Sequence, residues 1–162
     1  MRFHLGMPFS SRPSSLAFLS HGPDQEAQRL AALHQYDIRG EVAETAFHHL
    51  VRLAARLLEA PIAVLSFVDA DTHRIPVAVG MSTGAYSLHD TSPAFLKTLQ
   101  ADDYHVVADA QRPVVEDFFL SDVPSGVSFF LGVPLTGPAG ERLGGLCVMD
   151  RTPRSSSKAD ID

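Results

Sequence analysis

Residues 126–150 of the 162-residue chain, GVSFFLGVPLTGPAGERLGGLCVMD, decide the fold because they predict two β-strands joined by a tight turn. From Val127 to Leu135 every odd-numbered residue is apolar, and this period of two is typical of a strand with one buried face. The GPAG segment at 137–140 supplies the backbone conformations of a hairpin turn, and 143–149 resumes an apolar run that is too short for a helix. We therefore expect an antiparallel hairpin in the middle of a sheet.

Two helices are expected before the first strand. Apolar residues at helical spacing predict a helix over 24–34 that ends by Gly40. A stronger apolar stripe, with charged residues on the other faces, predicts a second helix over 41–59. Pro61 ends this helix, since proline cannot continue its hydrogen bonding.

Short strands and one short helix are expected in the middle of the chain. Asp69 to Thr72 supply a turn between two apolar segments, and Ser92 before Pro93 indicates a capped helix start. In order, the expected segments are strands at 62–70 and 74–80, a loop at 81–89, a helix at 93–100, a strand at 104–108 and a helical turn at 113–118.

This order of elements predicts an α+β fold with a central, mainly antiparallel sheet of five to six strands and helices on both faces. At 162 residues the chain has the length of one domain. We expect a flexible leader at 1–23, the folded domain at 24–154 and a polar tail at 155–162.

The composition limits the classes of function that fit this chain. With 45% hydrophobic residues and a net charge of −6, the chain is typical of a soluble globular protein and is poorly suited to nucleic acid. No apolar run is long enough to span a membrane, and the N-terminus lacks a continuous secretory signal. Cys147 is the one cysteine, which excludes an intrachain disulfide and favours the cytoplasm.

The hairpin also resembles the closing signature of GAF domains, in the segment GVPLTGPAGERLGGLCVMDRTPR at 132–154. Further matches lie upstream in the same order: RLAALHQYDI at 29–38, LVRLAARLLEAPIAVLSFVDAD at 50–71 and VVADAQRP at 106–113. The resemblance implies a PAS-like sheet with the long helices on one side and a small-molecule pocket on the other, under residues 81–125. It also implies a sensory role in bacterial signal transduction, as in sensor histidine kinases and diguanylate cyclases.

No catalytic constellation emerges from the residues. Cys147 lies inside an apolar strand, where a thiol packs as a small hydrophobe, and the GAF-like reductases of methionine sulfoxide use several cysteines. Residues 89–94, HDTSPA, stand where bilin-binding relatives carry a cysteine, so no covalent bilin is expected. The Asn-Lys-Phe-Asp-Glu pattern of cyclic-nucleotide-binding relatives is missing.

A metal or haem site is not expected either. His48 and His49 are adjacent and point about 100° apart on a helix, so they do not share a metal ion easily. His73, His89 and His105 fall near the expected pocket, yet a lone histidine is more often a hydrogen-bonded residue than a haem ligand. The chain's cofactor is therefore left unassigned.

Candidate pocket residues are the aromatic and polar side chains around the short helices. The same aromatic residues are equally compatible with a filled core. The candidates are Tyr86, His89, Ser92, Phe95, Asp109, Phe118 and Ser128.

We interpret the chain as a non-catalytic sensory or regulatory domain that binds a small molecule or a signalling partner such as a sensor kinase. A degenerate domain with a closed pocket, acting only in dimerisation, is the alternative, and a redox enzyme ranks third. Surplus apolar residues on the first two helices predict a parallel homodimer. They are Ala27, Leu30, Ala31, Ala46 and Leu53.

Overall fold

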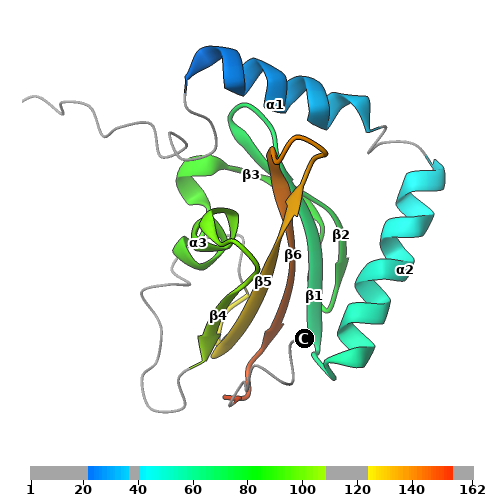
Figure 1. The fold of residues 1–162 in the computed structure, drawn as a ribbon. Helices are drawn as coiled ribbons and strands as arrows, with labels where there is room; N and C mark the ends of the chain where they lie inside the picture. The colour runs from blue at the N-terminus through cyan, green and yellow to red at the C-terminus, as the bar shows by residue number, and fades with distance from the viewer. Residues whose placement is uncertain (1–21, 37–40, 109–123, 155–162) are drawn as a thin grey trace, which may run out of the picture.

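The computed structural model describes residues 22–36, 41–108 and 124–154, which form three layers (Figure 1). A six-stranded antiparallel sheet has α1 and α2 on one face and α3 on the other. The elements are α1 Pro23–Gln35, α2 Glu41–Leu57, β1 Ile62–Val68, β2 Thr72–Val79, β3 Gly84–Ser87, the 3-10 helix η1 Leu88–Asp90, α3 Pro93–Gln100, β4 His105–Ala108, β5 Phe129–Thr136 and β6 Arg142–Asp150. The predicted α+β class is confirmed. The predicted leader up to residue 21, the helical turn at 113–118 and the tail at 155–162 lie outside the described residues.

The strands follow the order β3-β2-β1-β6-β5-β4. β5 and β6 form the predicted hairpin, whose turn is closed by a hydrogen bond from the Gly137 N–H to the Glu141 carbonyl at 2.8 Å. β6 also pairs with β1, with Val64 opposite Cys147. The hairpin therefore supplies one of the two central strands and joins both halves of the sheet.

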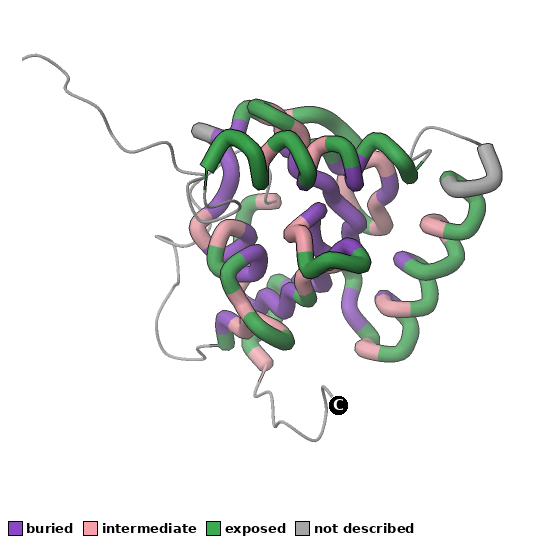
Figure 2. Tube along the Cα trace, turned by 45° about the horizontal axis from the view of Figure 1, so that its top comes forward, coloured by how far each residue is buried: buried purple, intermediate pink, exposed green. Residues whose placement is uncertain are grey.

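The prediction that one face of the first hairpin strand is buried was wrong for its beginning. The first four residues of β5, 129–132, are all buried, as are all seven residues of β1. Helices cover both faces of these central strands, and Figure 2 shows the buried positions gathered between the layers. The alternation of buried and exposed residues along a strand is lost wherever both of its faces are covered.

A close approach of β1 and β6 requires glycine in the middle of the sheet. A side-chain Cβ at Gly144 would lie 1.9 Å from the Ser66 carbonyl oxygen. The register places Phe67 opposite Gly144 and Ser66 opposite Gly145, beside a bulge in β1. Gly144 of the GAF-like signature thus permits strand contact that a larger residue would block.

The segment predicted as a loop at 81–89 contains a strand. β3 pairs with β2, with Tyr86 opposite His73 and Gly84 opposite Ile75. Its residues are mostly exposed and small, so no apolar alternation marks it in the sequence. The neighbouring strand, rather than its own side chains, defines β3.

One buried arginine fastens α1 to the sheet. The Arg29 side chain is 1% exposed, and its Nη1 donates to the Val68 carbonyl at 2.7 Å and the Arg142 carbonyl at 3.3 Å. Its other nitrogens bind both carboxylate oxygens of Glu26, one turn earlier, at 2.7 and 2.8 Å. The guanidinium is therefore neutralised within α1 and satisfies carbonyl groups at the ends of β1 and β6.

A second arginine holds the end of β6 against the end of α2. Arg154 donates to the carbonyl oxygens of Leu58 and Glu59 and pairs with Asp150. Glu59 has a φ of 48°, which ends the helix before the predicted residue 59. Burial raises the pKa of Asp150, but the Thr152 N–H and the Arg154 guanidinium outweigh it and hold that pKa below its ordinary 3.8.

Within the described ranges, every helix is too short or too polar to cross a lipid bilayer.

Replacing the buried arginine, Arg29→Met, is expected to lower the free energy of unfolding by about 2 to 4 kcal/mol, because buried carbonyls lose their donor and Glu26 its partner. Chemical denaturation monitored by circular dichroism measures this change. The exposed α2 residue offers the matched control Arg52→Met, which should change stability by about 0.5 kcal/mol or less. Equal losses for both variants would contradict the anchoring role.

Acid should remove the stabilisation that Asp150 provides. Its carboxylate is favoured in the folded state, so the contribution is complete above pH 3.8 and is lost as pH falls through the lowered native pKa. The stability difference between wild type and Asp150→Asn should therefore be constant near neutral pH and shrink in acid. Denaturation curves from pH 7 to about pH 3 test this, and a difference that grows in acid would contradict it.

Candidate functional site

The predicted helix start at Ser92 is confirmed and positions one group of candidate residues. Ser92 is fully buried, and its hydroxyl accepts a hydrogen bond from the Phe95 N–H at 3.3 Å. Pro93 occupies the first helical position. The cap fixes where α3 begins and directs Phe95 against the sheet, where a Cβ at Gly145 would lie 3.1 Å from its ring.

An imidazole occupies the space beside Phe95. The His73 ring stacks on the Phe95 ring with centroids 4.0 Å apart and an angle of 16°, and both side chains are 2% exposed. Tyr86 lies next to them, its ring 6.4 Å from that of His73. Thr91 Oγ1 is 3.4 Å from His73 Nδ1. These residues form a packed aromatic cluster between β2, β3 and α3.

The seven candidate residues are not all brought together. Tyr86, Ser92 and Phe95 gather at the aromatic cluster, whereas Ser128 precedes β5 and donates to the Arg151 carbonyl at 2.8 Å. Asp109, Phe118 and the side chain of His89 lie outside the described residues. Ligand binding by these candidates stays a prediction.

Cys147 lies in the core, as the sequence predicted. It is 1% exposed and packs in the cluster that includes Ile62, Phe95 and Met149, on the α3 side of the sheet. Burial in apolar surroundings disfavours the thiolate and limits access to it. Among the residues that the structure describes, no three His, Cys, Asp or Glu side chains are grouped so as to hold a metal ion.

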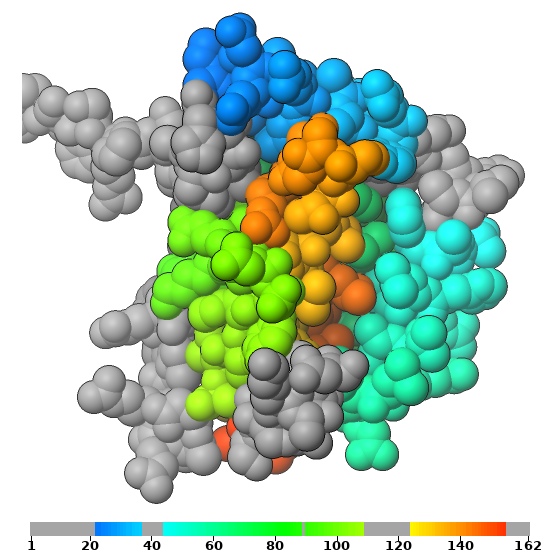
Figure 3. All heavy atoms as spheres, in the orientation of Figure 1, coloured from blue at the N-terminus to red at the C-terminus, as the bar shows by residue number. Residues whose placement is uncertain are grey.

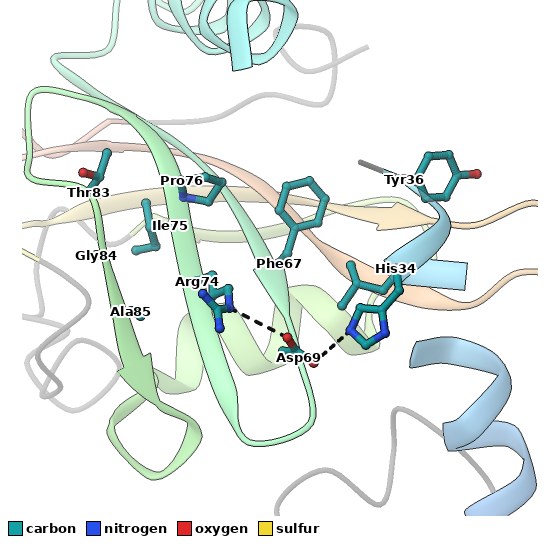
Figure 4. Close-up of a pocket in the computed structure, with 11 residues that line it drawn as sticks. His34, Tyr36, Phe67, Asp69, Arg74, Ile75, Pro76, Thr83, Gly84 and Ala85 are labelled. Carbon is teal, nitrogen blue, oxygen red and sulfur yellow. Dashed lines mark ion pairs between the residues drawn. The ribbon is translucent and has the colours of Figure 1, made fainter. Parts of the chain in front are cut away.

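A groove on the α1 side of the sheet was missed by the sequence reasoning. It has a volume of about 770 Å³ and lies between the end of α1 and the β2–β3 hairpin (Figure 4). The lining residues are Leu33, His34, Tyr36, Phe67, Asp69, Arg74, Ile75, Pro76, Thr83, Gly84 and Ala85. They come from segments far apart in the chain, so no local motif could have indicated the groove.

Three charged or titratable side chains meet on one wall of the groove. Asp69 Oδ1 lies 3.4 Å from His34 Nε2, and Asp69 Oδ2 lies 3.7 Å from Arg74 Nε. Partial burial raises the pKa of Asp69, but the Ala70 N–H, His34 and Arg74 together hold it below 3.8. The sequence placed Asp69 and Asp71 in a turn, where the Ala70 N–H donates to Asp69 Oδ1 and the Thr72 hydroxyl donates to Asp71 Oδ1, each at 2.9 Å. The carboxylate of Asp69 thus stabilises the turn and also places a negative charge on the wall of the groove.

Comparison with known proteins identifies the family. The GAF domain family matches residues 43–162, and the chain belongs to it. The fold agrees with the GAF domain of a phosphoenolpyruvate-protein phosphotransferase from Acinetobacter, with a TM-score of 0.56 and 15% identity over 86% of this chain and 85% of that one. A type II free methionine-R-sulfoxide reductase from Thermoplasma acidophilum has a TM-score of 0.58 and 16% identity over 75% of this chain and 83% of that one.

A curated relative adds a signalling context. A cyclic di-GMP phosphodiesterase from Pseudomonas aeruginosa is 28% identical over 133 residues, which is 82% of this chain. The chain spans 22% of the length of that relative. It is a GAF domain of the type found in signalling proteins.

Truncating the stacked ring, Phe95→Ala, is expected to lower the free energy of unfolding by about 3 to 5 kcal/mol, because it leaves a cavity beside His73. Thermal and denaturant unfolding measure the change. Gln100→Ala, at an exposed residue of the same helix, is the control and should be nearly neutral. A loss below about 1 kcal/mol for Phe95→Ala would mean that the ring is loosely packed and the α3 side is open.

Proposed function

We propose that the chain is a non-catalytic sensory or regulatory domain that acts as a homodimer and passes a binding event to a signalling partner. The observation that carries this proposal is an apolar stripe on the outer surface of α2. Ala46, Leu50, Leu53 and Leu57 follow one another at spacings of four, three and four residues. This alternation is the spacing of the contact positions in a coiled coil.

The stripe is exposed and separate from the face that α2 packs on the sheet. Leu50, Leu53 and Leu57 are 41%, 52% and 73% exposed, whereas Val51 and Ala55 are buried against the core. Figure 3 shows α2 along one flank of the molecule. Large apolar side chains aligned on a surface helix favour a protein partner, and a twofold symmetric copy offers the same stripe.

Ala27 and Ala31 of α1 are also exposed, and Leu30 is half-buried, in line with the surplus that the sequence predicted. The anchor at Arg29 fixes α1 to the same sheet face as α2. Deleting α1 would therefore damage the core, and point substitutions are the better test of the interface.

The burial of the one cysteine supports a non-catalytic role. The single cysteine, Cys147, is buried, so it is poorly placed to attack a sulfoxide, and a lone thiol cannot resolve an intramolecular disulfide. A chain with one cysteine, and that one buried, also fits the reducing cytoplasm. The similarity to part of a cyclic di-GMP phosphodiesterase favours regulation of a cyclic-dinucleotide enzyme.

A dimerisation module with a closed pocket is the second candidate. The stacking of His73 on Phe95 at 4.0 Å favours it, because these rings fill space that a ligand on the α3 side would need. Native mass spectrometry and an absorption spectrum of the purified protein distinguish the two: a retained small molecule supports the sensor, and an empty dimer supports the module.

A charge in the stripe, Leu53→Glu, should convert the dimer to a monomer, because a desolvated carboxylate at a contact position has no partner. Light scattering coupled to size exclusion at about 50 μM measures the change. The control Arg52→Glu lies on a different side of α2 and should leave the dimer intact. A monomeric wild type, or a dimeric Leu53→Glu variant, would contradict the proposal that α2 forms the dimer interface.

A further inference from the structure

We propose that the groove between α1 and the β2–β3 hairpin binds a small zwitterion with an apolar side chain, as presented by a free apolar α-amino acid. The site goes beyond the proposed function. Leu33 and Phe67 belong to the core on the α1 and α2 side of the sheet, whereas Phe95 and His73 are packed together on the α3 side. Binding in the groove can therefore be tested apart from the α3 side and from dimerisation.

The groove has the size and the floor of a small-molecule site. Its volume of about 770 Å³ falls within the range of roughly 300 to 1,000 Å³ that such sites occupy. Leu33 and Phe67 are 3% and 7% exposed, belong to the core on that side of the sheet and form the floor of the groove, and the half-buried Pro76 also lines it. Figure 4 shows Phe67 near the side chains of Asp69 and Arg74. An apolar ligand group would be removed from water on this floor.

Asp69 and Arg74 present opposite charges side by side without forming a hydrogen bond to each other. The Arg74 Nε to Asp69 Oδ2 distance of 3.7 Å is too long for one. The Arg74 side chain is 47% exposed, and its planar group carries donors suited to a carboxylate. Asp69 Oδ1 already accepts the Ala70 N–H at 2.9 Å. Oδ2 and the guanidinium therefore offer an acceptor and a set of donors to a ligand.

The charge pattern selects a ligand that carries both signs. A simple anion would approach the ionised carboxylate of Asp69, and a simple cation would approach Arg74, so each meets one like charge. In an α-amino acid the ammonium and carboxylate groups are close together, which lets the ammonium pair with Asp69 while the carboxylate pairs with Arg74. Both contacts are charge-assisted.

The wall formed by β3 leaves room for the ligand. Thr83, Gly84 and Ala85 are exposed, and none has a large side chain. β3 is the edge strand of the sheet, and the helices α1 and α2 pack over other strands. Among the described residues, the groove is thus open to solvent along Thr83, Gly84 and Ala85.

Isomeric ligands test the proposal in the wild-type chain without any substitution. Norleucine and 6-aminohexanoate have the same atoms, but only norleucine has adjacent charges and a free apolar chain. Hexanoate lacks the ammonium group, and pentylamine lacks the carboxylate. Titration followed by ¹H–¹⁵N NMR should show norleucine shifting the amides of residues such as Phe67, Ile75 and Gly84. Affinities for the other three compounds should be about tenfold weaker or lower.

Substitutions then identify the contacts. Asp69→Asn keeps the oxygen that accepts the Ala70 N–H and removes the charge, and Arg74→Gln removes the guanidinium. Each should weaken norleucine binding by about tenfold or more, while Arg52→Gln on the exposed side of α2 should not. Binding that is equal for norleucine and 6-aminohexanoate, or equal for norleucine and hexanoate, would overturn the proposal. So would no response to norleucine, a response confined to the α3 side, or unchanged affinity in both charge variants. A monomeric protein that still binds norleucine would support the ligand site in the groove and would contradict the proposed homodimer.

Discussion

The buried guanidinium of Arg29 is the interaction on which the α1 side of the domain depends. A charged group that is 1% exposed is costly unless it is neutralised and hydrogen-bonded. Here Glu26 supplies the charge, and the carbonyls of Val68 and Arg142 supply further acceptors. Helix α1 is therefore fixed over the point where β1 ends and β6 begins. That placement brings Leu33 and His34 to the groove. The contacts of Arg29 that stabilise the packing of α1 therefore also position lining residues of a candidate site.

The two faces of the sheet differ in how they use their space. On the α3 side, His73 and Phe95 stack and Cys147 is sealed in the core, so the rings themselves occupy the centre of that layer. On the other side, the described residues leave a groove between the end of α1 and the β2–β3 hairpin, with Asp69 and Arg74 on its wall. The difference follows from helix placement, since α2 packs over β1 and β2 and α1 packs over β6.

The second arginine connects the end of the domain to the helix that we propose as the dimer contact. Arg154 binds carbonyls just after α2 and is held by Asp150 at the end of β6. Its guanidinium also lies 5.5 Å from the centre of the Phe129 ring. The residues that follow the sheet are thus fastened to α2 by charge-assisted hydrogen bonds. Any shift of α2 against a second copy would act on the chain as it leaves the domain.

The sequence by itself determined the elements whose signal is local. The period of two and the GPAG turn gave the β5–β6 hairpin, helical spacing gave α1 and α2, and Ser92 before Pro93 gave the start of α3. The burial of Cys147 followed from its apolar strand. Only the tertiary structure decided what depends on distant partners. β3 exists because β2 pairs with it. The first half of β5 is buried on both faces because helices lie on both sides, and the groove joins residues from α1 and three strands. Asp69 shows the difference most clearly. Its turn, and with it the nearness of Arg74, could be predicted from neighbouring residues, but its contact with His34 forms only when α1 meets the β1–β2 turn in the fold.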